Sequence, residues 1–411
     1  MRALPLRGEP AKFAGVRTSS PFALARVGLA CVLAACGGRS QHSGANDGSG
    51  GAAGDSAGRT PVCGHTGGRS GDDFEIPSGG TNTRLYNFVD RDDGSLLGFR
   101  GPTLVRLDRD GELEPFEGDR ALTEAMASAQ SLQIAPGGQA LLARDAVGLS
   151  VFDGEGMLLA AFEAPPDTTL LRSSFSESGR LIQSVYGQVD PEHEHPELVE
   201  LRALDGSVVS ELLPRERNPI VPASDDSILW PAYPTESQLT VTDLTQTPLY
   251  DVELGAGVRL VRVSDDGTHL ALQLDSADVT HVENGVASPP YTPDATVWDV
   301  KLAPGGRFSS FSQATPGRIT LFDAGRWLRA RALPLEYVNT FDVNDSGDVV
   351  VGGQDAEGRA HVLILDANLD VQFTCAGGPD DGAYSPSVRF TRDGRRAIAL
   401  FNDRLTVFGV R

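Results

Sequence analysis

Two histidines spaced two residues apart, His193 and His195, carry the clearest potential for metal chemistry in the chain. They lie in Asp190-Pro-Glu-His-Glu-His-Pro-Glu197, where four carboxylates surround them. Imidazole and carboxylate groups bind zinc and other divalent ions. Two histidines, however, supply only half of a usual ligand set. The segment therefore favours an acidic surface loop that binds no ion, and a metal site at His193 and His195 is the alternative.

Two acidic turns carry oxygen ligands on alternate residues, as a calcium loop does. In Asp342-Val-Asn-Asp-Ser-Gly347, the twelfth position of such a loop would be Gly353 instead of the usual bidentate Glu. Asp90-Arg-Asp-Asp-Gly94 matches the pattern no better. Because a similar acidic turn recurs along the chain, these residues are predicted to shape turns and not to bind calcium.

The sequence contains none of the motifs of the common enzyme classes that we considered. It has no phosphate-binding loop, dinucleotide fingerprint, kinase signature or HExxH zinc motif. Gly54-Asp-Ser-Ala-Gly58 matches the G-x-S-x-G pattern of serine hydrolases, but it lies in a Gly/Ser/Ala-rich segment and not at a strand-to-helix elbow. The sequence thus identifies no catalytic residue and no cofactor site. A site built from scattered polar residues would leave no such motif.

The elements that must position these residues follow a repeat, which is clearest at Val261–Leu272. An alternating apolar segment, the turn Asp-Asp-Gly267 and a second alternating segment follow one another there. Alternation of this kind across Gly/Asp turns predicts antiparallel β-strands. The turn recurs at intervals of 39 to 48 residues, at Gly94, Gly138, Gly179, Ser227, Gly267, Gly306, Gly347 and Gly394.

A period near 40 residues with three or four strands per repeat resembles the blade of a WD40-like β-propeller. The resemblance covers about residues 72–411 and is one of architecture, because the Gly-His and Trp-Asp dipeptides of that family are mostly absent. It implies an all-β propeller of eight blades, or of seven if the repeat at Ser227, which lacks a turn glycine, is an irregular insert. The last repeat lacks a fourth strand, so Asp73–Pro77 is predicted to pair with it and close the ring.

The N-terminus resembles a bacterial lipoprotein signal. An apolar run at residues 27–35 follows Arg26, is too short to span a bilayer, and closes on Leu33-Ala-Ala-Cys-Gly37 in the manner of a lipobox. The resemblance implies that residues 1–35 are removed and that Cys36 carries palmitate-like acyl chains, which anchor the protein to a membrane. An ordinary cleaved signal with an incidental cysteine is the alternative.

The segment after Cys36 predicts a tether and a location. Residues 36–60 are mostly Gly, Ser, Ala, Asp and Asn, a composition that cannot bury enough apolar surface to fold. We therefore expect a disordered tether, followed by the propeller domain at residues 61–411. Gly37-Gly38 lacks the Asp that enterobacteria use for inner-membrane retention, which favours the outer membrane within the cell envelope.

Two cysteines, Cys63 and Cys375, remain outside the signal and the lipid site. Disulfides persist in exported proteins. Cys63 precedes the closing strand and Cys375 ends the outer strand of the seventh repeat, so the two positions are neighbours in a closed ring. A Cys63–Cys375 disulfide is therefore predicted, and the absence of Cys-x-x-Cys spacing argues against a metal site.

The charge of the chain bears on its partners. Residues 1–35 hold five of the 35 basic and one of the 56 acidic residues, so the remainder carries a formal charge of −25. A surface this acidic repels phosphate backbones, and nucleic acid is not an expected partner. We predict a monomeric, lipid-anchored propeller that binds a protein or glycan through a loop face without catalysis. The alternative is an exported hydrolase or lyase that depends on a metal at His193 and His195.

Overall fold

The computed structural model describes residues within one compact unit that spans Gly58–Arg411. The described residues are 63–65, 74–77, 85–91, 93–100, 103–108, 113–116, 120–176, 178–189, 194–213, 221–222, 227–230, 238–313, 316–377, 386–401 and 404–410. Residues 1–62, with the proposed signal, Cys36 and the tether, lie outside them, as does His193.

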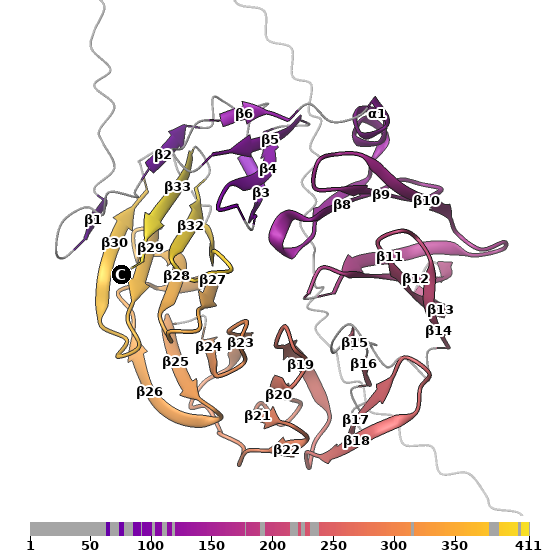
Figure 1. The fold of residues 1–411 in the computed structure, drawn as a ribbon. Helices are drawn as coiled ribbons and strands as arrows, with labels where there is room; N and C mark the ends of the chain where they lie inside the picture. The colour runs from indigo at the N-terminus through magenta and orange to yellow at the C-terminus, as the bar shows by residue number, and fades with distance from the viewer. Residues whose placement is uncertain are drawn as a thin grey trace, which may run out of the picture. The chain divides into compact units, whose positions relative to one another are not determined.

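Eight antiparallel sheets follow one another around a centre and form the blades of a β-propeller (Figure 1). In each blade the first strand lies next to the centre and the last strand lies at the rim. Blade 1 consists of β3 (Leu85–Asp90), β4 (Leu96–Arg100), β5 (Thr103–Leu107) and β6 (Leu113–Pro115), and blade 2 of β7 (Ser131–Ile134), β8 (Ala140–Arg144), β9 (Gly148–Asp153) and β10 (Leu158–Glu163). Blade 3 consists of β11 (Thr169–Phe175), β12 (Leu181–Val189), β13 (Glu194–Ala203) and β14 (Val208–Leu212), and blade 4 of β15 (Val221–Pro222), β16 (Ser227–Trp230), β17 (Gln238–Asp243) and β18 (Pro248–Glu253). Blade 5 consists of β19 (Val258–Val263), β20 (His269–Leu274), β21 (Val279–Glu283) and β22 (Val286–Ala287), and blade 6 of β23 (Val297–Leu302), β24 (Phe308–Gln313), β25 (Arg318–Asp323) and β26 (Arg326–Ala332). Blade 7 consists of β27 (Tyr337–Val343), β28 (Val349–Gln354), β29 (Ala360–Leu365) and β30 (Val371–Ala376), and blade 8 of β31 (Ser387–Phe390), β32 (Arg396–Leu400) and β33 (Arg404–Gly409).

The eight-bladed, all-β prediction is confirmed, and the seven-blade alternative is wrong. The repeat without a turn glycine is a blade of its own, because Ser227 begins β16 and β16 pairs with β15 on one side and β17 on the other. The blade therefore tolerates the loss of the glycine.

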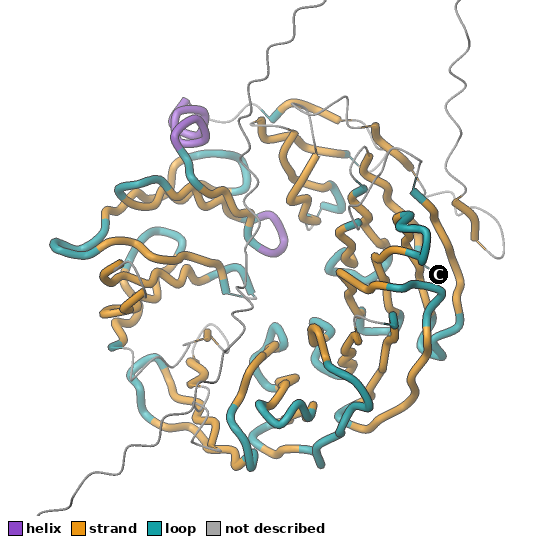
Figure 2. Tube along the Cα trace, turned by 180° about the vertical axis from the view of Figure 1, so that it is seen from behind, coloured by secondary structure: helices purple, strands orange, loops and turns teal. Residues whose placement is uncertain are grey.

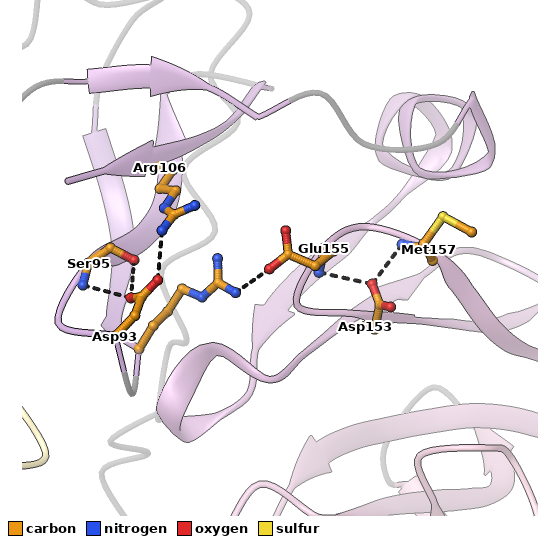
Figure 3. A network of polar contacts seen from close by, with 7 residues as sticks. Asp93, Ser95, Arg106, Asp153, Glu155 and Met157 are labelled. Atoms are coloured by element: carbon orange, nitrogen blue, oxygen red, sulfur yellow. Dashed lines mark hydrogen bonds and ion pairs between the residues drawn. The ribbon is translucent and has the colours of Figure 1, made fainter.

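The turn between the first and second strands is shaped by an acidic side chain, as the sequence predicts. In blade 5, Asp266 Oδ1 accepts hydrogen bonds from the Thr268 N–H at 3.0 Å and from the Ser264 hydroxyl at 2.7 Å. Gly267 follows with φ of +73°, a left-handed conformation that glycine adopts without strain. The aspartate after the third strand caps a second turn in the same way: Asp153 Oδ1 accepts the N–H groups of Glu155 and Met157 (Figure 3).

Two N-terminal strands close the ring from outside. β2 (Phe74–Pro77) pairs antiparallel with β33, so that Phe74 lies opposite Val407, and completes blade 8 as predicted. β1 (Cys63–His65), which the sequence did not predict, adds a fifth strand to blade 7 next to β30. The outer edges of blades 7 and 8 are thus covered by the same N-terminal segment.

The hydrophobic core is divided among the interfaces between neighbouring blades. Between blades 7 and 8, for example, Val350 and Val362 are fully buried together with Phe408. The rings of Phe373 and Phe408 lie 4.3 Å apart between centroids in the same cluster. The middle strands provide this packing with consecutive apolar residues, because each blade buries side chains on both of its faces: Val349, Val350 and Val351 of β28 are all fully buried.

Among the described residues, one α-helix departs from the all-β pattern, besides a short 3-10 turn at Pro136–Gly138. α1 (Arg120–Ser128) lies outside the ring at its rim, between blades 1 and 2 (Figure 2). Its Leu122 is buried in a cluster with Phe99 and Leu141, so the helix covers an apolar seam. Among the described residues, no helix has the length and apolarity that a membrane span requires.

Candidate functional site at one mouth of the central channel

The predicted histidine segment lies between the second and third strands of blade 3, but only part of it is a loop. Glu194 begins β13, so His195 lies in a strand, where it pairs with Gln188 of β12. His193 lies outside the described residues. No described residues form a group of three or more His, Cys, Asp or Glu side chains suited to a metal ion. His193 and His195 therefore stay a prediction.

A different set of predicted turn residues surrounds a cavity of about 280 Å³ at the centre of the ring. Its walls come from the first strands and the turns after them in blades 1, 2, 5, 6, 7 and 8. The last apolar residue of each of these strands faces the cavity: Val89, Ile134, Val263, Leu302, Val343 and Phe390. The turn residues then form the mouth. Because antiparallel strands alternate in direction, this mouth and the β12–β13 hairpin lie at opposite ends of the blades.

The turns around the mouth are joined from one blade to the next. The Asp265 N–H of blade 5 donates to the Pro304 carbonyl of blade 6 at 3.0 Å. The Gly305 N–H of blade 6 donates to Asp345 Oδ1 of blade 7 at 2.7 Å. Each contact links turns at equivalent positions, so it fixes the spacing of two neighbouring blades.

The links continue beyond blade 7. Asn344 Nδ2 donates to the Gly394 carbonyl of blade 8 at 3.1 Å, and the Arg392 N–H of blade 8 donates to Asp90 Oδ2 of blade 1 at 2.5 Å. An ion pair between Arg91 and Glu155 joins blades 1 and 2 (Figure 3). The described turns are therefore connected without a break from blade 5 to blade 2.

Arg392 also spans the mouth itself. Its Nη2 donates to Asp265 Oδ2 at 2.8 Å, which joins blade 8 to blade 5 although blades 6 and 7 lie between them along the chain. A Cβ atom on Gly137 of blade 2 would lie 3.3 Å from Arg392 Nη1, so the absence of a side chain there leaves room for the guanidinium. The Arg392 side chain thus approaches blades 5 and 2, and its backbone N–H contacts blade 1.

Charges of alternating sign follow one another along the innermost strands of blades 5, 6, 7, 8 and 1, and the last three line the cavity: Arg262, Asp299, Lys301, Asp342, Arg389 and Asp90. Asp299 accepts Arg262 Nη2 at 2.8 Å and lies 3.3 Å from Lys301 Nζ. Arg389 Nη2 lies 3.6 Å from Asp90 Oδ1, an ion pair longer than a hydrogen bond. Each charge in this series has an opposite charge beside it.

Burial changes the electrostatics of the central members of this series. It raises the pKa of the Asp342 carboxyl above its ordinary value, against the opposing effect of the hydrogen bond from the Phe390 N–H and of nearby Lys301. Asp342 Oδ1 accepts the Val343 N–H at 3.0 Å and Oδ2 accepts the Phe390 N–H at 2.9 Å, so one carboxylate holds two strands. Burial also lowers the pKa of the Arg389 guanidinium.

The carboxylates at this mouth are engaged by protein groups. Asp90, Asp265, Asp342 and Asp345 each accept a hydrogen bond from another residue. The arrangement can hold blades at fixed positions, and it offers no described pair of nucleophile and base. The sequence predicted the acidic turns but missed Arg389 and Arg392, because their partners lie in other repeats and no local pattern marks them.

Two further predicted residues meet at the rim. Cys63 of β1 lies opposite Cys375 of β30 in the antiparallel pairing, and the fully buried Cys375 is in a disulfide.

In blade 5, His281 is almost fully buried beside His269, with Nε2 of the former 3.3 Å from Nδ1 of the latter. Burial, and secondly the neighbouring His269, lower the pKa of His281 to about 4. Local sequence patterns place these two histidines in strands and do not indicate that they form a pair.

No family model and no curated protein matches the sequence. Among solved structures, the chain is similar to the C-terminal WD40 domain of Sif2, with a TM-score of 0.54 and 12% identity over 81% of this chain and 100% of that chain. It is also similar to BamB from Moraxella catarrhalis, with a TM-score of 0.51 and 12% identity over 85% of this chain and 100% of that chain. At this identity the likeness shows the fold alone, a β-propeller.

Proposed function

We propose that this chain is a non-catalytic binding or scaffold protein of the cell envelope, held to the outer membrane by acyl chains on Cys36. The observation that carries the proposal is the series of turn-to-turn contacts at the channel mouth from blade 5 to blade 2, with Arg392 bridging to Asp265. A ring fixed in this way keeps its surfaces at constant positions, which lowers the entropic cost of binding a partner. The shared scaffold-like fold agrees with such a role.

The course of the N-terminal strands supports the anchor. β1 and β2 lie on the outer edges of blades 7 and 8, so the segment that precedes Cys63 joins the ring at its rim and not at a channel mouth. In this proposal a tether of residues 36–60 leaves the loop faces free for a protein or glycan partner, and the domain acts as a monomer.

We also propose that the disulfide of Cys375 is formed with Cys63. The two Cα positions are paired in the register of β1 and β30, and no other cysteine lies among the described residues. Such a bond holds the N-terminal segment on blade 7.

The anchor is tested by labelling the full-length protein with an alkyne analogue of palmitate in growing cells. We expect label in the wild type, in the outer-membrane fraction, and none in Cys36→Ser. A Cys36→Ser variant that still carries the label would exclude the lipid site.

The binding function is tested on the full-length protein, tagged after Arg411 and recovered from envelopes after brief chemical crosslinking. We expect a protein or glycan to be recovered in a fixed ratio to the propeller, and not with another lipoprotein treated in the same way. Recovery of the propeller without any specific companion contradicts the proposal.

A further inference from the structure

Large apolar side chains are exposed on the outer strands of three consecutive blades. They begin with Met157, Leu158 and Leu159 in blade 2, of which Leu159 is 43% exposed. Blade 3 adds Val208, Val209 and Leu213, the last of them 71% exposed, and blade 4 adds Leu249. We call these seven residues the rim patch. None of them belongs to a hydrophobic cluster between blades, although Ala160 and Phe162 on β10 do.

Each outer strand that carries the rim patch packs on the next blade. A Cβ atom on Gly206, in the turn before β14, would lie 2.7 Å from Ala160 of β10. The Ser210 hydroxyl of β14 donates to the Leu244 carbonyl of blade 4 at 2.6 Å, and Gln246 Nε2 donates to the Glu211 carbonyl at 3.3 Å. The strands that expose these apolar residues are therefore held against one another at two blade boundaries. Apolar residues exposed together on neighbouring elements mark interaction sites in soluble proteins.

The same strands present open edges. β10 and β14 are each the last strand of their sheet, and no described strand pairs with their outer side. On blades 7 and 8 the corresponding edge is covered by β1 and β2 of this chain. The molecule itself thus shows that an outer strand accepts a further antiparallel strand, as in recognition by strand addition.

The charges beside the rim patch indicate what kind of partner segment would bind there. Glu163 ends β10 and Glu211 lies in β14; both are exposed, and no described residue forms an ion pair with either. A segment with apolar side chains on alternate residues and a basic residue near its end would complement this surface. A lipid surface fits less well, because hydrocarbon cannot satisfy the N–H and C=O groups of an open strand edge.

We propose that the rim patch binds an extended, apolar segment of a partner protein, which adds antiparallel to the open edge of β10, beside Leu159, or to that of β14, beside Val209. This inference adds a surface to the binding function proposed above and rests on it. The partner's backbone pairs with the open edge, and its apolar side chains cover the patch.

The test begins with a photoreactive benzoylphenylalanine at position 159 in the full-length protein, in envelopes. The matched control carries it at position 327, because Trp327 is an exposed residue of the outer strand of blade 6. We expect a protein adduct from position 159 and none of the same mass from position 327. The crosslinked partner segment, identified by mass spectrometry, is then made as a labelled peptide for titration by fluorescence anisotropy.

We expect the peptide to bind the wild type and Trp327→Asp equally, and to bind Leu159→Asp/Val209→Asp at least tenfold more weakly. Proline in the middle of the peptide, which removes a backbone N–H, should weaken binding similarly, and this arm does not depend on the folding of a variant. Equal affinity for the double variant or the proline peptide overturns the inference, as does an adduct with lipid or with a second copy of this chain. If partners are recovered from envelopes with the double variant in unchanged yield, the rim patch is not the binding surface, but the proposed binding function still holds. If no partner is recovered at all, both proposals are refuted.

Discussion

Arg392 Nη2 and Asp265 Oδ2 lie 2.8 Å apart across the mouth of the central channel and join blade 8 to blade 5. The Arg392 N–H meanwhile donates to Asp90 of blade 1, so one residue contacts the ring at two distant points. The two side chains are 44% and 35% exposed, and water therefore screens their attraction. This contact positions the guanidinium more than it stabilises the fold.

Replacing Asp265 with Ala should release Arg392 at little cost in stability. We expect the free energy of unfolding in urea to change by about 1 kcal/mol or less, because exposed ion pairs contribute little. The reaction of Arg392 with phenylglyoxal, followed by peptide mass spectrometry, should become faster. Arg307→Ala, which removes an exposed pair within blade 6, is the control and should leave Arg392 reactivity unchanged. An unchanged rate in Asp265→Ala would show that the contact does not form in solution.

Asp342→Ala should destabilise the domain more strongly. The change leaves the Val343 and Phe390 N–H groups without their acceptor and removes a negative charge that faces Lys301 and Arg389. We expect a loss of about 2–3 kcal/mol in the free energy of unfolding. Asp345→Ala, at an exposed turn position with one hydrogen bond, should cost about 1 kcal/mol. Equal losses in the two variants would contradict the role assigned to burial.

The buried His281 should make stability depend on pH. Its pKa is about 4 in the folded chain against an ordinary value of 6.5, so the unfolded chain binds more protons between these two pH values. The free energy of unfolding should therefore fall as the pH is lowered from about 6.5 towards 4, by about 3 kcal/mol from this group. His281→Gln should flatten this part of the profile. An NMR titration of His281 with a midpoint near 6.5 would remove the basis of the prediction.

Reduction should destabilise the wild type through the proposed Cys63–Cys375 bond. In the chain-entropy model, a disulfide that closes a loop of over 300 residues contributes about 5–6 kcal/mol. We expect dithiothreitol to lower the urea midpoint of the wild type and to leave Cys63→Ser/Cys375→Ser unchanged. Both cysteines should resist maleimide labelling in unfolded, unreduced protein. Labelling of either one before reduction would disprove the pairing.

Much of the fold could be predicted from local sequence patterns. Asp266-Gly267 predicts its turn because the carboxylate and the left-handed glycine act within five residues, and the last repeat predicts β2 because it lacks one strand. The mouth of the channel escaped prediction for the converse reason. Arg392 and Asp265 are 127 residues apart, and only ring closure brings them together. Blade 4 shows that a turn glycine is not needed for a blade to form, because Ser227 occupies the position of the glycine in the repeat and β16 still pairs with both of its neighbours.

The pairing of β2 with β33 sets an order of events during biosynthesis. Phe74 and its partner Val407 are 333 residues apart, so the ring cannot close until all of the intervening chain has been made. Contacts so distant along the chain form slowly, because a long loop must be ordered first. Until then the edge of blade 8 is unpaired and prone to wrong association. The maturation of this protein therefore requires a period in which the nascent edge is shielded, and its yield should depend on chaperones of the compartment in which it folds.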